Sequence, residues 1–524
     1  MSAQLSRSPA CAQGHRAVQR DGPHGRRWRM ARPTRRQLLT HGATALGALA
    51  LGSAGTLAVS DWAAEGAIPP GPAPGALLDD ASRINPTAVR GLLFADPSTD
   101  RTAELIRPLL RRIAAGDDPA LAVAGVRHSM GGQSMLAGGW VLDTRPMNRI
   151  SLDSAAGVVR VGAGTTWREL IPVLNAHGCS PKVMQSNHDF SIGGSLSVNC
   201  HGWHAGHPPI AATVRGLRVL TASGEIVSCG PAVNPELFGL VLGGYGLFGV
   251  ILDADLEVWP NAVYEPHFDT VAAADYAEAY ARLLAGTDTE MAYGRLSVDP
   301  RGFLEQAIIV RFTPQAGTRG EILPLSSPES PELQRAVFRN SAGSDLGKAV
   351  RWGLEREIAP WLAGPLSRNS IQNQPAAVFA DHSAETCDIL HEYFVSPEAL
   401  GKFVDAAREI IPRSGAELLN VTVREVRRDT VSTLAYARQD VFGLVMNFRQ
   451  ERTGAADTAM RALTRELVEA VLAVGGTFYL PYRLHATRDQ VDRAYPGWQA
   501  AMAAKSRIDP SPVFRNALFD AYGA

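Results

Sequence analysis

A short loop with a histidine at its centre carries the clearest chemical signal in this chain of 524 residues. The loop runs from Gly125 to Gln133 with the sequence GVRHSMGGQ, directly after the apolar, strand-like run 121–124. Glycines let the backbone approach a ligand closely and adopt a positive φ. Successive backbone N–H groups in such a turn form a concave site for an anion. We therefore expect the loop to bind a pyrophosphate, with His128 beside it.

Two further motifs are rich in small residues. The first, SIGGSLS at 191–197, leads into VNCHG at 198–202, and the second is LGGYGLFGV at 242–250. The second contains a GxGxxG pattern at 244–249, which in a Rossmann fold lies between a strand and a helix. Here apolar and acidic residues alternate towards the end of 250–258, as in a half-buried strand. The Rossmann interpretation is therefore rejected.

Together, the three motifs and their spacing resemble the FAD-linked oxidases of the vanillyl-alcohol oxidase type, whose FAD-binding domain is called PCMH-type. The loop at 125–133 is most similar to that of the cytokinin dehydrogenases in this family. The resemblance implies that the loop amides hold the FAD diphosphate and that His128 is bonded covalently to the flavin 8α-methyl group. It assigns FAD contacts to Val126, Arg127, His128, Ser129, Met130, Gly131, Gln133, Ser191, Gly194, Ser197, His201 and Val250.

Candidates for substrate contact lie on a predicted strand at 417–426. Asn420, Thr422 and Arg424 alternate with apolar residues, so the three share one face. That face is either solvated or the floor of a polar pocket. Alditol-oxidising relatives carry an arginine in the corresponding strand, which favours the pocket, but they have a glutamate where Thr422 stands, which leaves the substrate open.

The second candidates for catalysis are Arg483 and His485, in a tail that returns to the flavin in relatives. His201 and His204, beside the second motif, either face the flavin or cap a turn. The five cysteines, Cys11, Cys179, Cys200, Cys229 and Cys387, show no metal-ligand spacing, so no metal is expected. We interpret Cys200 as a buried small residue and not as a second flavin attachment.

Strands that alternate with short helices indicate an α+β protein. The resemblance implies a two-part PCMH-type FAD-binding domain with an inserted α+β substrate domain. The expected boundaries are 85–260 for the FAD-binding domain, 261–476 for the substrate domain and 477–524 for the returning segment. Within the substrate domain, residues 320–375 are rich in Pro, Ser and charge and predict an irregular or mobile insertion, and Asp457 is predicted to cap a helix ending near Val474.

The amino terminus has the order of an export signal. Residues 1–36 hold nine arginines and one acid, and the pair Arg35–Arg36 precedes an apolar run at 43–59. We expect a disordered leader and a twin-arginine signal over 1–67, followed by a Pro/Gly-rich linker over 68–84. An uncleaved membrane anchor is the alternative, and Met30 competes with Met1 as the true start. The expected location is therefore periplasmic or extracellular.

A formal net charge of −1 gives no reason to expect a nucleic-acid partner. The sequence thus predicts an FAD-dependent oxidoreductase that moves a hydride from a CH–OH group of a sugar, polyol, lactone or sterol-like alcohol to flavin N5. Electrons would pass to O₂ or another acceptor. The alternatives are an amine dehydrogenase of the cytokinin type and an exported flavin-binding electron-transfer protein.

Overall fold

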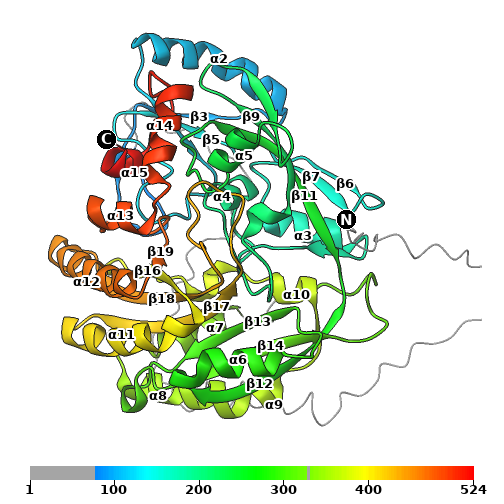
Figure 1. The fold of residues 1–524 in the computed structure, drawn as a ribbon, viewed down its shortest axis with the longest axis vertical. Coiled ribbons are helices and arrows are strands. Elements are labelled where there is room, and N and C mark those ends of the chain that lie inside the picture. The colour runs from blue at the N-terminus through cyan, green and yellow to red at the C-terminus, as the bar shows by residue number, and fades with distance from the viewer. Residues whose placement is uncertain (1–76, 327–330, 524) are drawn as a thin grey trace, which may run out of the picture. The chain divides into compact units, whose positions relative to one another are not determined.

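The loop at 125–133 emerges from the carboxyl end of a small parallel sheet. In this computed structural model, which describes residues 77–326 and 331–523, β3 (Gly91–Phe94), β5 (Trp140–Asp143) and β4 (Leu121–Ala124) pair in the order β3-β5-β4 (Figure 1). Helix α2 (Thr99–Ala115) connects β3 to β4. Pro108 lies inside this helix, and Gly116 ends it in the left-handed region. The predicted leader and signal lie outside the described residues, as does the linker through residue 76.

A second, antiparallel sheet supports the other two glycine-rich motifs: the motif at 242–250 leads directly into its central strand, and the helix that follows Ser191 packs on it. Its order is β10 (Ile226–Cys229), β9 (Val214–Leu220), β11 (Val250–Pro260), β7 (Val158–Gly162) and β6 (Ile150–Asp153), and β8 (Cys179–Pro181) pairs with β11. Helix α3 (Trp167–Asn175) begins at a capping box of Thr166 and Glu169, whose Thr-x-x-Glu spacing is recognisable in the sequence. Helix α5 (Pro235–Val241) precedes the GxGxxG pattern and strand β11 follows it, so the Rossmann interpretation is wrong, as expected.

The third sheet is antiparallel and has eight strands. Their order is β15 (Leu366–Ser367), β12 (Val263–Ala272), β14 (Gln306–Pro314), β13 (Met291–Leu296), β17 (Glu417–Val426), β18 (Val441–Glu451), β16 (Thr386–Val395) and β19 (Thr477–Phe478). The predicted strand 417–426 is therefore confirmed, and it lies at the centre of the sheet. A β-bulge interrupts its pairing with β18 between Leu418 and Asn420.

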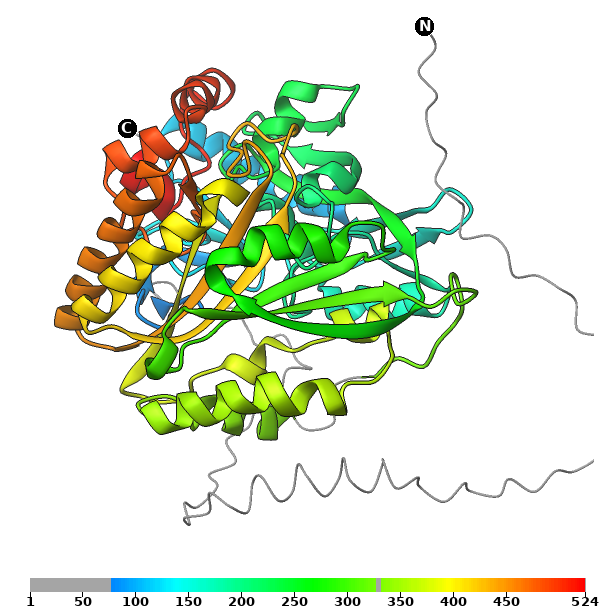
Figure 2. The same cartoon turned by 60° about the horizontal axis from the view of Figure 1, so that its bottom comes forward.

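The two faces of this sheet have different partners. Helices α6 (Tyr276–Leu284), α11 (Leu400–Ser414) and α12 (Gly454–Ala473) cover one face, and Figure 2 shows α11 in yellow beside α12 in orange. Val423 is paired with Gly294, whose Cα packs against the Tyr276 ring of α6, so Val423 faces these helices. Because side chains alternate along a strand, Asn420, Thr422 and Arg424 face the other way.

Helices cover part of the opposite face as well. Arg351 of α8 (Asp345–Gly353) donates to the carbonyl of Leu419, and Arg295 of β13 donates to Glu355 at 2.9 Å. These helices correct the expectation that residues 320–375 are irregular. Their described part contains α7 (Pro331–Arg339), α8, a π-helix (Leu354–Ile358), α9 (Ala359–Leu362) and α10 (Arg368–Gln372). Proline and serine misled the prediction because they stand at helix starts: Pro331 opens α7 and Ser344 caps α8.

The last 40 residues pack against the first sheet. Helices α14 (Trp498–Ile508) and α15 (Ala517–Tyr522), in red, lie on the side of β3, and α13 (Arg488–Ala494) lies between them and α12 (Figure 1). The backbone N–H of Leu121 in β4 donates to Val513, and that of Arg515 donates back to Leu121. The buried ammonium of Lys505 donates to the carbonyls of Leu247 and Phe514 at 2.7 and 2.8 Å. The carboxyl-terminal segment therefore stabilises the strand from which the histidine loop emerges.

Candidate flavin and substrate site

The histidine loop is held in place by the carboxyl-terminal tail. The Met130 N–H donates to Pro481 at 2.8 Å, and the Gln133 amide donates to the carbonyls of Leu480 and Tyr482 at 2.6 and 2.8 Å. The side-chain oxygen of Gln133 accepts from the Gly131 N–H at 2.9 Å. The structure thus places the side chain of Gln133 between the loop and the tail, where it fixes the loop conformation.

The first half of the loop leaves its amides free for a ligand. None of the backbone N–H groups of Val126, Arg127, His128 and Ser129 donates to a protein acceptor within the described residues. Arg127 has a φ of 55°, a left-handed conformation that turns successive amides towards one side. Its guanidinium lies 3.5 Å from Asp143. Free amides in such a turn suit the diphosphate of FAD.

The second motif lies directly against the start of this loop. Helix α4 (Ile192–Ser197) follows Ser191, whose Oγ is buried and has no hydrogen-bond partner among the described residues. A Cβ added to Gly125 would lie 2.1 Å from this Oγ, so a side chain there would force Ser191 to move. The close approach of backbone at Gly125 to an unpaired buried hydroxyl fits a nucleotide cofactor held between the two motifs.

The third motif closes this region from the other side. The Tyr245 N–H donates to the carbonyl of Ser197 at 2.9 Å, and the Gly243 N–H donates to that of Leu196 at 3.0 Å. Val250 is fully buried in β11 opposite Leu220. Gly194 lies earlier on α4 than these two partners, and a Cβ there would be 3.0 Å from Ser191 Oγ. The structure therefore brings the three glycine-rich motifs together around one place.

His128 stacks on an aromatic ring. Its ring centroid lies 4.4 Å from that of Phe190 with an interplanar angle of 33°. Burial lowers the pKa of His128, and the negative charge of Asp189 opposes that shift. The imidazole is consequently neutral at physiological pH, which is the form that can act as a nucleophile.

Cys200 has the opposite properties. Its burial raises the pKa of the thiol to about 12, so the reactive thiolate does not form near neutral pH. The four described cysteines Cys179, Cys200, Cys229 and Cys387 are buried and form no disulfide with one another. These properties agree with the interpretation of Cys200 as a buried small residue.

The polar face of β17 carries unsatisfied groups. The Asn420 amide donates to Thr422 Oγ1 at 3.2 Å, and Arg424 Nη2 donates to Ser186 Oγ at 3.0 Å. Within the described residues, Oδ1 of Asn420, Nε of Arg424 and Oδ1 of the neighbouring Asn447 are buried without a hydrogen-bond partner. Leaving such an atom unpaired costs about 1–3 kcal/mol, which a polar ligand would relieve.

A buried carboxylate lies next to these groups on β16. Glu392 Oε1 accepts from His201 Nε2 at 2.7 Å, and Oε2 accepts from the Tyr482 hydroxyl at 3.0 Å. Burial raises the pKa of Glu392, but its interactions with His201, with the Arg424 guanidinium and with the Tyr482 hydroxyl outweigh it and leave the pKa below its ordinary value. The site therefore holds an ionised carboxylate away from water.

Arg483 and His485 lie on the far side of the loop. Arg483 donates to Asn85 and, at 2.7 Å, to Asp457 of α12, and its Nη1 lies 3.4 Å from the carbonyl of Met130. His485 bonds Thr464 through Nδ1 at 3.0 Å and Asp457 through Nε2 at 3.3 Å. Asp457 is therefore a partner of both and not the cap of α12; the cap is Thr453, whose hydroxyl accepts from the Ala456 N–H.

His204 is buried elsewhere. Its Nε2 lies 2.7 Å from the amide nitrogen of Gln372, and the Ala292 N–H donates to the carbonyl of the adjacent Trp203. Residues 203 and 204 thus join the second motif to α10 and β13.

Glu392, Tyr482 and Ser186 are site residues that the sequence analysis did not identify. The one signal for Glu392 was a charged residue within the otherwise apolar run 389–395.

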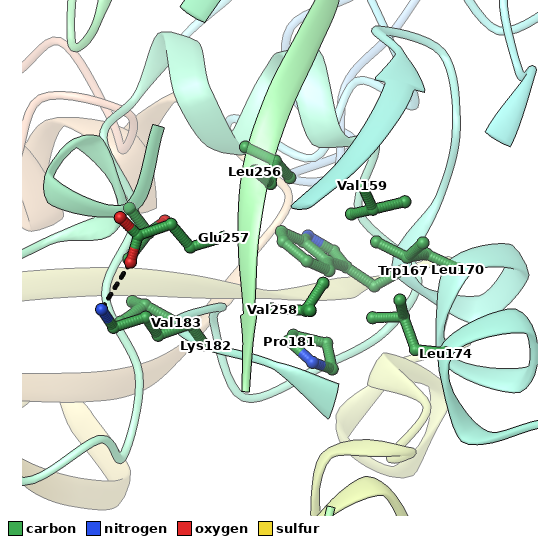
Figure 3. A pocket seen from close by; sticks show the side chains of 11 residues that line it. Val159, Trp167, Leu170, Leu174, Pro181, Lys182, Val183, Leu256, Glu257 and Val258 are labelled. Carbon is green, nitrogen blue, oxygen red and sulfur yellow. Dashed lines mark hydrogen bonds and ion pairs between the residues drawn. The ribbon is translucent and has the colours of Figure 1, made fainter. Parts of the chain in front are cut away.

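A small cavity beneath α3 is a packing feature. Figure 3 shows it lined by apolar side chains that include Val159, Trp167 and Leu256, with the ion pair of Lys182 and Glu257 at one side. Its volume is about 10 Å³, enough for at most a single water.

Over residues 77–326 and 331–523, no group of His, Cys, Asp and Glu is arranged to hold a metal, and no helix is long and apolar enough to cross a membrane.

Comparison with known proteins agrees with this geometry. Residues 102–230 match the family model described as the FAD binding domain. The chain is 33% identical over 187 residues to cytokinin dehydrogenase 1 of Oryza sativa subsp. japonica, covering 34% of this chain and 35% of that protein. It is 32% identical over 182 residues to decaprenylphosphoryl-beta-D-ribose oxidase of Mycolicibacterium smegmatis, covering 34% of this chain and 38% of that protein.

The histidine loop, α4 and the family match together indicate an FAD-binding domain. Over the matched stretches the chain is similar to FAD-linked oxidoreductases. The chain spans only about a third of the length of the relatives it matches.

Proposed function

We propose that the protein is an FAD-dependent oxidoreductase that takes a hydride from a CH–OH carbon of a sugar, polyol, lactone or sterol-like alcohol. Its FAD-binding domain and its similarity to enzymes named as dehydrogenases and oxidases support the reaction class. The observation that carries the proposal is the set of unpaired polar atoms on the sheet face beside the FAD-binding region, Asn420 Oδ1, Arg424 Nε and His201 Nδ1.

The charges at the site favour an alcohol over an amine. Arg424 is a permanent cation, and the nearby carboxylate of Glu392 already accepts from His201 and Tyr482. A protonated amine would meet a cation and find no free carboxylate, whereas hydroxyl groups can pair with the donor and acceptors that remain. An amine of the cytokinin type remains the second candidate because of the similarity to cytokinin dehydrogenases.

The chain's own residues would orient and activate the substrate. The free amides at 126–129 and the Ser191 hydroxyl would hold FAD, and the neutral His128 would attach to the flavin covalently. When bound, the flavin supplies a two-electron acceptor for the hydride of the substrate carbon. Arg424 would hold the substrate oxygen and stabilise negative charge that develops on it, and Asn420 would accept from a second hydroxyl.

The experiment is to purify the protein with its flavin and mix it with panels of alcohols, lactones and amines. Bleaching of the oxidised flavin spectrum under anaerobic conditions identifies the reducing substrate independently of the final acceptor. Oxygen uptake compared with dye reduction then separates an oxidase from a dehydrogenase. A flavin that no alcohol reduces, but that an amine does, would reject the proposal in favour of the second candidate. A flavin that no panel member reduces, but that a redox protein does, would favour electron transfer.

We also propose that the protein is exported through the twin-arginine route, because Arg35 and Arg36 precede an apolar run. That route carries folded proteins, which suits a chain that acquires FAD before export. Changing both arginines to lysine keeps the charge but removes the guanidinium groups. Accumulation of the precursor in the cytoplasm would support this route, and unchanged export would reject it.

A further inference from the structure

The pair His201–Glu392 is the most completely buried hydrogen-bonded His–carboxylate pair beside the unpaired groups of the sheet. His201 and Glu392 are only 4% and 3% exposed, and 2.7 Å separates Nε2 from Oε1. An ionised carboxylate can only accept, so the proton of this hydrogen bond belongs to Nε2 of the histidine. In a neutral imidazole the other nitrogen, Nδ1, is then a bare acceptor.

That acceptor has no partner in the protein. His201 Nδ1 is buried and makes no hydrogen bond among the described residues. Leaving a buried acceptor unpaired costs about 1–3 kcal/mol, and a merely structural histidine would be expected to satisfy both nitrogens. His391, on the same strand as Glu392 but on its other face, does so through Tyr393 and Thr464. In the described part of the chain, His188 Nε2 and His204 Nδ1 are also buried without a hydrogen-bond partner. His201 differs from these two because its other nitrogen bonds the buried Glu392 carboxylate, on the strand face that carries the unpaired Asn420 and Arg424 atoms. That position points to a ligand at His201 Nδ1.

The surroundings place this nitrogen beside the proposed substrate groups. Arg424 acts electrostatically on both Cys200, the residue before His201, and Glu392. Arg424 in turn donates to Ser186. The rings of Phe394, Tyr436 and Tyr479 lie 5.4 to 6.1 Å from the imidazole centroid and limit access of water.

We propose that His201 is the catalytic base of the proposed reaction and that Glu392 is the positioning residue that keeps its Nδ1 unprotonated. This inference rests on the proposed function. The substrate hydroxyl would give its proton to Nδ1 while the C–H bond breaks and its electron pair leaves with the hydride to the bound flavin. The alcohol is oxidised to a carbonyl, the flavin is reduced, and the proton stays on an imidazolium that the Glu392 carboxylate stabilises.

Tyr482 supports the carboxylate from the tail. Its hydroxyl donates to Oε2, the oxygen that His201 does not use, at 3.0 Å. Glu392 therefore has both oxygens satisfied and a fixed rotamer, which fixes the ring of His201 in turn. Because the tail also holds the histidine loop through Gln133, one segment would orient both the base and the flavin-binding loop.

The decisive variant is His201→Gln in the full-length, FAD-loaded protein. A glutamine amide can replace Nε2 in the hydrogen bond to Glu392 but offers nothing at the position of Nδ1. We expect the variant to keep its flavin content and melting temperature and to lose about 10²–10⁴-fold in kcat, the usual contribution of a general base. A variant that keeps both stability and turnover would show that the pair is only structural and would overturn the inference.

Glu392→Gln tests the positioning residue. An uncharged amide no longer stabilises the imidazolium, so we expect kcat to fall by about 10²-fold or more and the acid limb of the kcat/KM profile to shift to lower pH. An unshifted limb would overturn the role of Glu392. Matched controls are Glu417→Gln and His267→Gln, which change a glutamate and a histidine of the same sheet that bond Lys348 and Thr313. The charged or titratable groups around His201 are Glu392, Arg424, Cys200, His204, Tyr436, Tyr479 and Tyr482.

A second measurement does not depend on turnover. In protein labelled with ¹⁵N-histidine, the His201 signal, assigned by its loss in His201→Gln, should show the neutral Nε2–H form at pH 7. An Nδ1–H form or an imidazolium there would overturn the inference even if the enzyme is active. If no alcohol reduces the wild-type flavin, the proposed function fails, and this nitrogen measurement alone then decides whether Nδ1 is kept unprotonated.

Discussion

Replacing Gly125 by alanine tests whether the first two motifs really meet around the cofactor. The added Cβ would lie 2.1 Å from Ser191 Oγ and 3.1 Å from Ser191 Cβ. Rotation of the serine removes the first overlap but leaves the second, which is tighter than an ordinary van der Waals contact. Overpacking of this kind costs about 1–3 kcal/mol. If the strain falls on the FAD-bound conformation, affinity for FAD falls by about 5- to 150-fold, at 1.4 kcal/mol for each factor of ten.

The assay is the molar ratio of flavin to protein after gel filtration at low protein concentration, together with the melting temperature. Because a covalent bond would mask a loss of affinity, the series is made in a His128→Ala background. Gly353→Ala is the matched control, since a Cβ there meets nothing within 4 Å and the residue lies at the end of α8 without a positive φ. That control should be neutral or stabilising by up to about 1 kcal/mol.

The double variant with Ser191→Gly identifies the cause. Removing both serine atoms removes the overlap, so Gly125→Ala with Ser191→Gly should bind FAD better than Gly125→Ala alone. The two changes are therefore coupled in a double-mutant cycle. If Gly125→Ala retains FAD like its parent, or if Ser191→Gly gives no rescue, the contact between the two motifs does not limit cofactor binding and the argument is refuted.

Three other predictions follow from the site. His128→Ala should fold and bind FAD but release it on acid precipitation, whereas the wild-type flavin should stay with the polypeptide; release from both would exclude covalent attachment. Arg424→Ala should lower turnover by about 2.7–4 kcal/mol in activation free energy, or 10²–10³-fold, with an unchanged flavin spectrum and melting temperature, and full activity in this variant would remove β17 from the site. Burial, with the nearby His485, lowers the pKa of His391 from 6.5 to about 3. At this position the unfolded chain therefore binds more protons than the folded protein. The free energy of unfolding should consequently fall by up to about 1.4 kcal/mol per pH unit as the pH drops from 6 to 4. Urea titrations of wild type and His391→Gln check this, since the variant should show a shallower slope and an equal slope would disprove the contribution.

The local elements near the flavin loop followed directly from sequence pattern. Small residues, the capping box at Thr166 and the alternation in 417–426 depend on interactions between near neighbours in the chain. The helices of 331–372 did not, because few of their apolar side chains are buried and their prolines and serines stand at helix starts, where composition alone indicates a loop. The sequence also could not decide which residue caps α12, because both threonine and aspartate cap helices. In the structure Thr453 is the cap, and Asp457 instead accepts from Arg483.

The candidate site was predictable in part for a similar reason. Arg424 and Asn420 could be placed on one face because a strand alternates with a period of two. Glu392 and Tyr482 could not be placed in this way. Glu392 is 191 residues from His201 and 90 residues from Tyr482 in the sequence, and no periodic pattern indicates contacts between residues so far apart. Sequence reasoning found the residues that share an element with a recognisable motif, and the fold supplied the partners from other elements.

The attachment of the histidine loop to the carboxyl-terminal tail has a consequence for biosynthesis. Met130 and Gln133 take their partners from residues 480–482, and Leu121 takes its partner from Val513, nearly four hundred residues later. A ribosome has therefore made the whole nucleotide-binding surface long before it makes the residues that hold that surface in shape. Contacts this distant in sequence also form slowly. We accordingly expect FAD to bind only after residues 480–515 have been made, and a variant that lacks these residues to lose FAD binding first.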